Sequence, residues 1–240
     1  MAKQPNIILI NCDDLGYGDL ECYGSTCNHT PHLSKFASEA MRFTQFYASS
    51  PFCSPSRAAL MTGSMPPRVG FGDLNGRAVL FPRDPIGLSS DEMTLPRMLK
   101  NAGYATGMVG KWHCGDQTEF LPTRHGFDSY FGLPYSNDMG RQGQLRSNYP
   151  PLPLMRDEEV WQQQPDQRGL TERYVDECLR FIEAHREQPF FLYLSHMYVH
   201  VPLFVPQVFM ERSKNGGYGG AVDCIDWSVG VLMHRLRELG

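Results

Sequence analysis

The sequence predicts an α/β fold in which a largely parallel sheet lies between layers of helices. Two continuous apolar runs, at residues 6–10 and 190–194, have the length and composition of strands buried on both faces. Segments with helical periodicity lie between and after them, and strands that alternate with helices are typical of parallel sheets. Polar residues follow each run directly. Because ligand sites in open α/β sheets lie at the carboxyl ends of the strands, we expect the functional residues there.

The composition excludes several function classes. The chain has 240 residues, 41% of them hydrophobic and 20% charged, which is typical of a globular domain. Its net charge of −4 argues against a general nucleic-acid partner. No apolar run approaches the roughly 18 residues of a membrane span. The first residues lack the apolar region of a signal peptide, so the localisation stays open between the cytoplasm and a secreted or periplasmic chain whose signal was removed.

The seven cysteines contain no C-x-x-C pair, which argues against a zinc knuckle or a thioredoxin-type site. In an oxidising compartment, Cys22 and Cys27 could bridge a small loop. Free thiols are the simpler interpretation if the protein is intracellular.

Start signals, periodicity and turn residues predict the remaining elements. Thr30 and Pro31 begin a helix as N-cap and first helical residue. Alternation predicts a strand over residues 42–47, and the prolines and glycines of 64–90 predict a long irregular connection. The polar stretch 140–168 is interpreted as a surface excursion. Further predictions are a helix over 94–103, a strand over 104–110, a helix over 170–187 and an amphipathic helix over 218–239.

Two adjacent carboxylates, Asp13 and Asp14, follow the first strand. At about 4 Å and an effective dielectric constant near 20, their repulsion costs roughly 4 kcal/mol. A divalent cation removes that cost, and hard oxygen ligands favour Ca²⁺ or Mg²⁺. A solvated turn is the alternative, because Asp and Gly are common in turns.

The stretch from Cys53 to Arg57 reads Cys-Ser-Pro-Ser-Arg. Pro55 predicts a helix that begins at or just after it, and Gly63 can end that helix in a left-handed cap. Cys53 then lies at a helix N-terminus, where negative charge is favoured and an anionic substrate meets free N–H groups. A thiol there would be an activated nucleophile, with Arg57 folding back toward it. A buried structural cysteine is the alternative.

Cationic and imidazole side chains follow two further strands. Lys111 can hold an anionic oxygen, and His113 can move protons near neutral pH. The alternative is a lysine that extends to solvent and a packed histidine. His200 comes after the strand at 190–194 and can act as an acid toward a leaving group. His196 is a second candidate for that role.

These segments together resemble the sulfatase family. Residues 53–63 match the signature C-x-P-S-R-x-x-x-x-T-G, residues 103–113 look like the second signature, and residues 13–19 match D-D-x-G-x-G-D. The motifs occur in the family's order from Pro5 to the last residue, so the chain is identified as a member, most similar to the arylsulfatase A and N-acetylgalactosamine-6-sulfatase branch. The resemblance implies an alkaline-phosphatase-like fold.

The resemblance also implies a chemistry for each site residue. A separate maturation enzyme oxidises Cys53 to formylglycine, whose hydrate attacks the sulfur of an aryl or carbohydrate sulfate ester. Asp13, Asp14 and residue 53 bind Ca²⁺, with Mg²⁺ possible. By the same resemblance, Arg57 stabilises charge, Lys111 binds the diol and sulfate, and Ser136 forms a hydrogen bond to formylglycine. His113 acts as the base that regenerates the aldehyde, and His200 protonates the leaving oxygen.

Members of this family are about twice as long, so residues 1–240 are expected to form an incomplete N-terminal catalytic domain without the smaller C-terminal domain. In relatives the next strand ends in a D-N-G or D-H-G motif that completes the cation site, and a further lysine follows. Asp223 and Asp226 fall in a predicted helix and cannot replace those ligands. Two alternatives stay open: a phosphodiesterase or phosphonate monoester hydrolase of the same superfamily, and an inactive anion-binding fragment.

Overall fold

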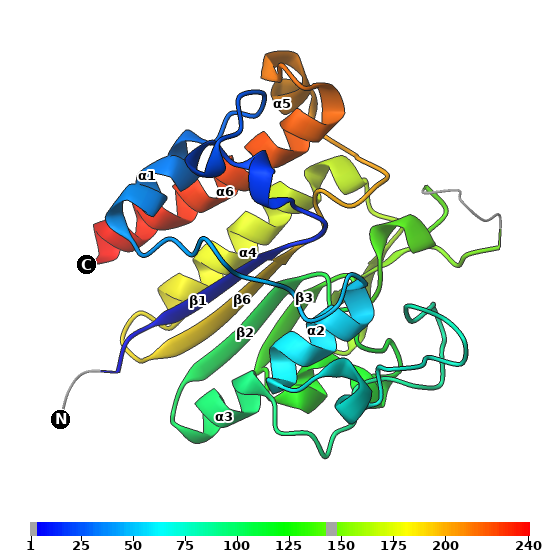
Figure 1. Cartoon of the computed structure of the whole chain (residues 1–240). Helices are drawn as coiled ribbons and strands as arrows, with labels where there is room; N and C mark the ends of the chain where they lie inside the picture. The colour runs from blue at the N-terminus through cyan, green and yellow to red at the C-terminus, as the bar shows by residue number, and fades with distance from the viewer. Residues whose placement is uncertain (1–3, 143–147) are drawn as a thin grey trace.

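A single mixed sheet forms the centre of the chain in the computed structural model, which describes residues 4–142 and 148–240 (Figure 1). The first four strands in spatial order pair in parallel, and the last two are added antiparallel. The spatial order is β1 (Ile7–Cys12), β6 (Phe190–His196), β2 (Ala105–Gly110), β3 (Ser129–Gly132), β4 (Pro153–Arg156) and β5 (Glu159–Gln163).

Helices cover both faces of the sheet. One face carries α1 (Pro31–Glu39), α4 (Leu170–Ala184), α5 (Gln207–Arg212) and α6 (Gly216–Leu239), and the other carries α2 (Cys53–Thr62) and α3 (Leu95–Asn101) (Figure 1). Successive side chains of a strand point to opposite faces. Leu192 and Leu194 of β6 therefore pack into the apolar cluster under α4 and α6, whereas Tyr193 packs into the cluster that includes α2. The predicted α/β fold class is confirmed.

The start of α2 differs slightly from the prediction. The helix begins at Cys53, with Phe52 as N-cap, two residues before Pro55. Gly63 ends it in the left-handed conformation, with φ of 64°, as expected. Cys53 is therefore the first residue inside the helix, and its backbone N–H is one of the groups without a partner inside the helix.

The predicted strand over residues 42–47 is wrong. This segment has no regular secondary structure, and the side chains of Phe43 and Phe46 are 59% and 76% exposed. A strand needs a neighbour for its backbone N–H and C=O groups. Among the described residues, no strand of the sheet pairs with this segment.

The interpretation of residues 140–168 as a surface excursion is also wrong in part. Its second half forms the hairpin of β4 and β5, and β4 pairs with β3 through Phe131 and Arg156. All five side chains of β5 are exposed. A strand without a buried face shows no hydrophobic alternation, which explains why the pattern concealed it.

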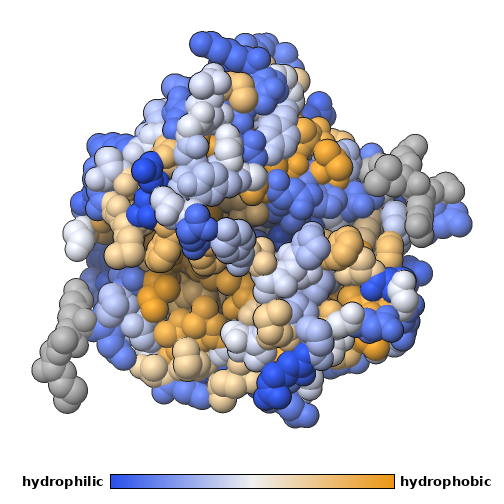
Figure 2. Space-filling model, viewed as in Figure 1, coloured by the Kyte–Doolittle hydropathy of each residue, from blue (hydrophilic) through white to orange (hydrophobic). Residues whose placement is uncertain are grey.

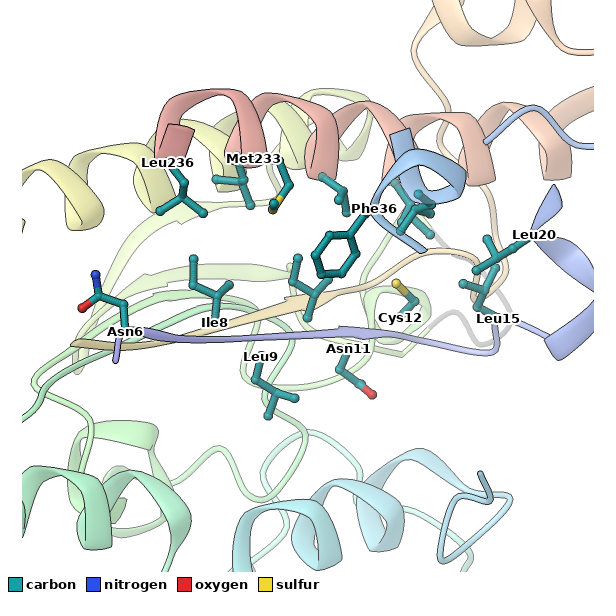
Figure 3. A pocket seen from close by; sticks show the side chains of 15 residues that line it. Asn6, Ile8, Leu9, Asn11, Cys12, Leu15, Leu20, Phe36, Met233 and Leu236 are labelled. Atoms are coloured by element: carbon teal, nitrogen blue, oxygen red, sulfur yellow. The ribbon is translucent and has the colours of Figure 1, made fainter. Parts of the chain in front are cut away.

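The other edge of the sheet, β1, borders an apolar groove. In the part of the chain that the structure describes, β1 pairs only with β6. A cavity of about 700 Å³ lies between β1 and α6, with Ile8 and Cys12 pointing into it and Phe36 of α1 beside them (Figure 3). Figure 2 shows apolar side chains gathered in a hollow on the face that carries β1. None of the described helices has the length and hydropathy needed to cross a lipid bilayer.

All seven cysteines are free thiols, so Cys22 and Cys27 form no bridge in the structure. The start of α1 also depends on a distant residue. Thr30 is the N-cap, but its hydroxyl accepts a hydrogen bond from the Glu21 N–H and makes no cap contact. Asp226 of α6 accepts instead from the N–H groups of His32 and Leu33, at 3.2 and 2.7 Å. The cap of α1 is therefore a tertiary contact.

Two buried histidines make stability depend on pH. Burial lowers the pKa of His125 and of His196 to about 4. The unfolded chain binds protons below about pH 6.5, whereas the folded protein binds them only near pH 4, so stability is complete above pH 6.5 and is lost as the pH falls.

We expect urea unfolding to show a loss of about 2 kcal/mol for each of these histidines between about pH 7 and pH 5. His125→Phe keeps a ring next to Trp112, against which His125 stacks, and is expected to lose correspondingly less on acidification. His29→Phe, at an exposed position, serves as the control. Equal acid sensitivity of the His125→Phe variant and the unmodified chain contradicts the assignment.

Candidate active site

The N-terminus of α2 opens into a cavity of about 420 Å³. The walls include Val79 and Phe81 from the irregular segment that follows α2. The polar side chains around the cavity come from segments far apart in the sequence, which the parallel sheet brings to one edge. They are Asp14, Cys53, His113, Ser136, Asp138 and His200.

A buried ion cluster adjoins this cavity. Lys111 is completely buried, and its ammonium group donates to Asp13 and, at 2.9 Å, to the Ser136 hydroxyl. Arg57 Nη2 lies 3.5 Å from the same Asp13 oxygen. Burial alone would raise the pKa of the Asp13 carboxyl, but Lys111 and Arg57 hold it well below its usual value. The cluster therefore contains two cations for one carboxylate, a net positive charge next to the cavity.

Ser195 is a site residue that the sequence analysis missed. Arg57 Nη1 donates to the Ser195 hydroxyl at 2.5 Å and to the Lys111 carbonyl at 2.7 Å, and the same hydroxyl donates to that carbonyl at 2.7 Å. These bonds direct Arg57 toward the ends of β2 and β6. The sequence did contain one signal for Ser195, because this hydroxyl residue follows the apolar part of β6 directly. The structure adds that Ser195 is completely buried, where a polar group needs a hydrogen-bond partner.

His113 follows β2 in a left-handed backbone conformation with φ of 63°. Its Nε2 lies 3.0 Å from the Leu80 carbonyl. Because a carbonyl only accepts, Nε2 carries the proton and Nδ1 has a free lone pair. Nδ1 has no hydrogen-bond partner among the described residues. Burial, assisted by the Lys111 charge, lowers the pKa of His113 well below its usual value, so the ring is neutral at pH 7 and Nδ1 keeps its lone pair.

The two histidines near the end of β6 differ in position. His200 lines the cavity, and its Nδ1 lies 2.6 Å from the Val201 carbonyl. In the neutral ring Nδ1 therefore carries the proton and Nε2 has the lone pair, and Nε2 bears a proton only in the imidazolium form. His196 is completely buried, and its Nε2 contacts the Ser228 hydroxyl of α6 at 3.0 Å. His196 does not line the cavity, so the geometry places only His200 at the site.

The Cys53 thiol is not activated as the sequence suggested. Burial raises the pKa of Cys53, and the opposing charge of Lys111 does not reverse the effect because Asp13 also raises it. The donors of α2 and two nearby cations are thus insufficient to stabilise a thiolate. The unmodified Cys53 thiol therefore lies where a nucleophile would be needed, but the raised pKa disfavours the thiolate, which is the reactive form.

Asp13 and Asp14 have the hard oxygen donors that suit Ca²⁺ or Mg²⁺. Asp14 is exposed and lines the cavity, in a left-handed conformation with φ of 62°. Asp13 is already paired with Lys111 and Arg57. Within residues 4–142 and 148–240, no group of three or more His, Cys, Asp or Glu side chains could hold a metal ion. Since Ca²⁺ takes about 6–8 oxygen ligands, these residues do not form a complete cation site.

The structure therefore brings the predicted residues to one place. Cys53, His113, Ser136, His200 and Asp14 line the cavity. Asp13, Lys111 and Arg57 form the cluster next to it, joined to the cavity through the bond between Lys111 and Ser136. Asp223 and Asp226 lie in α6, as expected.

Comparison with known proteins gives the same assignment along the whole chain. The Sulfatase family model matches residues 5–240. The chain is 41% identical to N-acetylgalactosamine-6-sulfatase of Sus scrofa, covering 99% of this chain and 48% of that protein, and 40% identical to arylsulfatase A of Homo sapiens, covering 100% and 50%. It thus spans about half the length of these relatives.

A solved structure agrees with the fold. The crystal structure of Ps i-CgsB in complex with k-i-k-neocarrahexaose superposes with a TM-score of 0.83 and 31% identity, covering 99% of this chain and 56% of that one. Since the family model covers nearly the whole sequence and the relatives are similar throughout it, the chain belongs to the sulfatase family.

Proposed function

We propose that this chain supplies the catalytic part of an enzyme that hydrolyses sulfate monoesters, with residue 53 as the nucleophile after its conversion to formylglycine. One observation carries the proposal. Cys53 begins α2 and lines a cavity that also holds His113, Ser136 and His200, next to a buried cluster with excess positive charge. Anions are favoured at helix N-termini.

The raised pKa of Cys53 supports the conversion. A protonated thiol is a poor nucleophile, whereas the hydrate of an aldehyde at the same carbon supplies an oxygen nucleophile without a thiolate. The conversion is a two-electron oxidation: Cβ loses its bond to sulfur and one C–H bond and gains a C=O bond, and the sulfur leaves as sulfide. It requires a separate maturation enzyme and a two-electron oxidant such as molecular oxygen, with water or the oxidant as the source of the carbonyl oxygen.

The chain's own residues can then perform the remaining tasks. Lys111 and the free N–H groups of α2 stabilise the negative charge on the sulfate oxygens. His200 Nε2 can give a proton to the departing oxygen when the ring is protonated. Attack by one hydrate oxygen breaks the S–O bond to the leaving group and leaves sulfate esterified to residue 53. His113 Nδ1 then accepts the proton of the second hydroxyl at residue 53, so that the C–O bond to sulfate breaks, the aldehyde forms again and sulfate leaves. Arg57 holds Asp13, Ser195 and the Lys111 carbonyl in position.

Asp13 and Asp14 are proposed as the part of a Ca²⁺ site that this chain supplies. A cation there would add positive charge near the sulfate. No step above depends on it, because the described residues alone do not complete its coordination.

The substrate class is a sulfate monoester with an aryl or carbohydrate leaving group. Names of similar proteins support both leaving groups, since one relative is N-acetylgalactosamine-6-sulfatase, another is arylsulfatase A and a solved relative is in complex with k-i-k-neocarrahexaose. Hydrolysis of phosphodiesters or phosphonate monoesters is the second candidate, because the anion-binding arrangement also suits a tetrahedral phosphorus centre.

The test is a substrate panel on protein isolated from its native host. Nitrophenyl sulfate, nitrophenyl phenylphosphonate and bis-nitrophenyl phosphate are compared with Ca²⁺ and after chelation with EDTA. The mass of the peptide that contains residue 53 is measured in parallel by mass spectrometry, and conversion of the cysteine lowers this mass by about 18 Da. We expect the sulfate to be hydrolysed fastest and the converted peptide to be present. A preference for either phosphorus substrate overturns the sulfatase proposal, an unmodified Cys53 overturns the nucleophile, and full activity in EDTA overturns the cation.

A further inference from the structure

Asp138 lines the same cavity without a part in the proposed chemistry. It lies in the short 3-10 turn Asn137–Met139, which follows the Ser136 that accepts a hydrogen bond from Lys111. Its Oδ1 is buried and accepts no hydrogen bond from any residue in the described ranges. Burying an acceptor without a donor is unfavourable, and in a ligand cavity a bound ligand can supply that donor.

We propose that Asp138 selects the leaving group of the substrate by accepting a hydrogen bond from a hydroxyl group of a sulfated sugar. This inference rests on the proposed function and concerns the same cavity. The charge of Asp138 excludes it as a sulfate ligand, because two anions in one cavity repel each other. A carboxylate accepts only, so its partner is a donor on the remainder of the substrate.

The rest of the cavity agrees with a sugar of limited size. Its volume of about 420 Å³ is at the lower end of the range for small-ligand sites, about 300–1,000 Å³. Apolar side chains, among them Val79, Phe81 and Met139, line it together with Asp138. Polar side chains, among them His113 and His200, also line the cavity, and in small-ligand sites such polar groups determine orientation and specificity. The C–H face of a sugar ring can contact the apolar side chains while a hydroxyl meets Asp138.

Binding measurements test the inference without any need for turnover. Three ligands are titrated calorimetrically into the chain: inorganic sulfate, cyclohexyl sulfate and glucose 6-sulfate. Cyclohexyl sulfate has a ring of similar size without hydroxyl groups. We expect glucose 6-sulfate to bind at least tenfold more tightly than cyclohexyl sulfate. In Asp138→Ala this advantage is expected to fall to threefold or less, because one charge-assisted hydrogen bond is lost.

The other two ligands serve as internal references. Their affinities are expected to stay the same or to rise slightly in Asp138→Ala, since a negative charge is removed. Asp176→Asn, at an exposed position on α4, is the matched control and is expected to change none of the three. An Asp138→Ala variant that loses affinity for all three ligands alike, or for none, overturns the assignment.

Failure of the inference and failure of the proposed function are distinguishable. Hydrolysis of nitrophenyl sulfate together with equal affinities for glucose 6-sulfate and cyclohexyl sulfate overturns the role of Asp138 and leaves the sulfatase proposal intact. Absence of binding for all three sulfates contradicts both. A fourth outcome, loss of thermal stability in Asp138→Ala together with the unchanged preference for the sugar, assigns Asp138 to the fold and also overturns the inference.

Discussion

Replacing Cys53 by alanine is expected to abolish the hydrolysis of nitrophenyl sulfate. Alanine retains Cβ but lacks the bond from Cβ to sulfur whose loss would yield the aldehyde. It removes no hydrogen-bond partner from the ion cluster formed by Asp13, Lys111 and Arg57. Loss of a nucleophile costs on the order of 10⁴–10⁶ in turnover. The measurement compares kcat of enzyme produced together with the maturation activity, and thermal unfolding shows that the variant is folded.

Cys27→Ala is the matched control, because Cys27 is an exposed free thiol outside the cavity. It is expected to retain full activity. Cys53→Ser separates the conversion from simple nucleophilicity, since a serine hydroxyl can attack but has no bond from Cβ to sulfur from which the proposed conversion starts. Residual sulfatase activity in Cys53→Ala within tenfold of the unmodified enzyme shows that another residue attacks the sulfate.

Replacing Lys111 by methionine is expected to produce the largest loss of stability among the site variants. The side chain is completely buried, and it donates to Asp13 and Ser136. Without it, the buried Asp13 carboxylate retains only the longer contact with Arg57 at 3.5 Å. Breaking a buried ion pair by removing one partner costs about 3–5 kcal/mol, a large part of the roughly 5–15 kcal/mol that stabilises a domain. Equilibrium urea unfolding measures this loss.

Arg168→Ala is the control for the loss of an exposed ion pair, because Arg168 and Asp166 are 65% and 59% exposed. Exposed pairs contribute about 0–1 kcal/mol. A variant without any charge in the cluster, Arg57→Met with Asp13→Asn and Lys111→Met, tests the cause. The double change at Asp13 and Lys111 alone would leave Arg57 as a buried cation without its carboxylate. The triple variant is expected to be more stable than Lys111→Met, and a triple variant no more stable than Lys111→Met contradicts the explanation by a poorly compensated carboxylate.

The local pattern of the sequence was sufficient for the elements that bury an apolar face. Phe190 to Leu194 could only be a buried strand, and the helix of α6 followed from apolar residues three and four apart. The pattern failed where burial did not decide. Phe43 and Phe46 alternate as in a strand but have no paired neighbour, whereas β5 is a strand whose five side chains are all exposed.

The candidate site likewise contains residues that the sequence could identify and contacts that it could not. The match to the sulfatase signatures, at the predicted ends of strands, assigned Asp13, Lys111 and His113 to the site, and parallel strands place their carboxyl ends at one edge of the sheet. The sequence could not show that Ser195 holds Arg57, nor that Asp226 caps α1 from 193 residues away. Each of these contacts joins residues that are far apart in the sequence, and local sequence patterns do not show which distant residues meet in the folded chain.

Sequence alone thus determined the strands and helices that bury an apolar face and the types of chemical group that line the cavity, because these depend on local periodicity and on residue type. The charge state of Cys53 was decided only by the tertiary structure. A helix N-terminus and two cations favour a thiolate when considered locally. In the folded chain, burial and the negative charge of Asp13 outweigh them and raise the pKa of the thiol, because solvent is excluded only after the sheet and its helices have packed together.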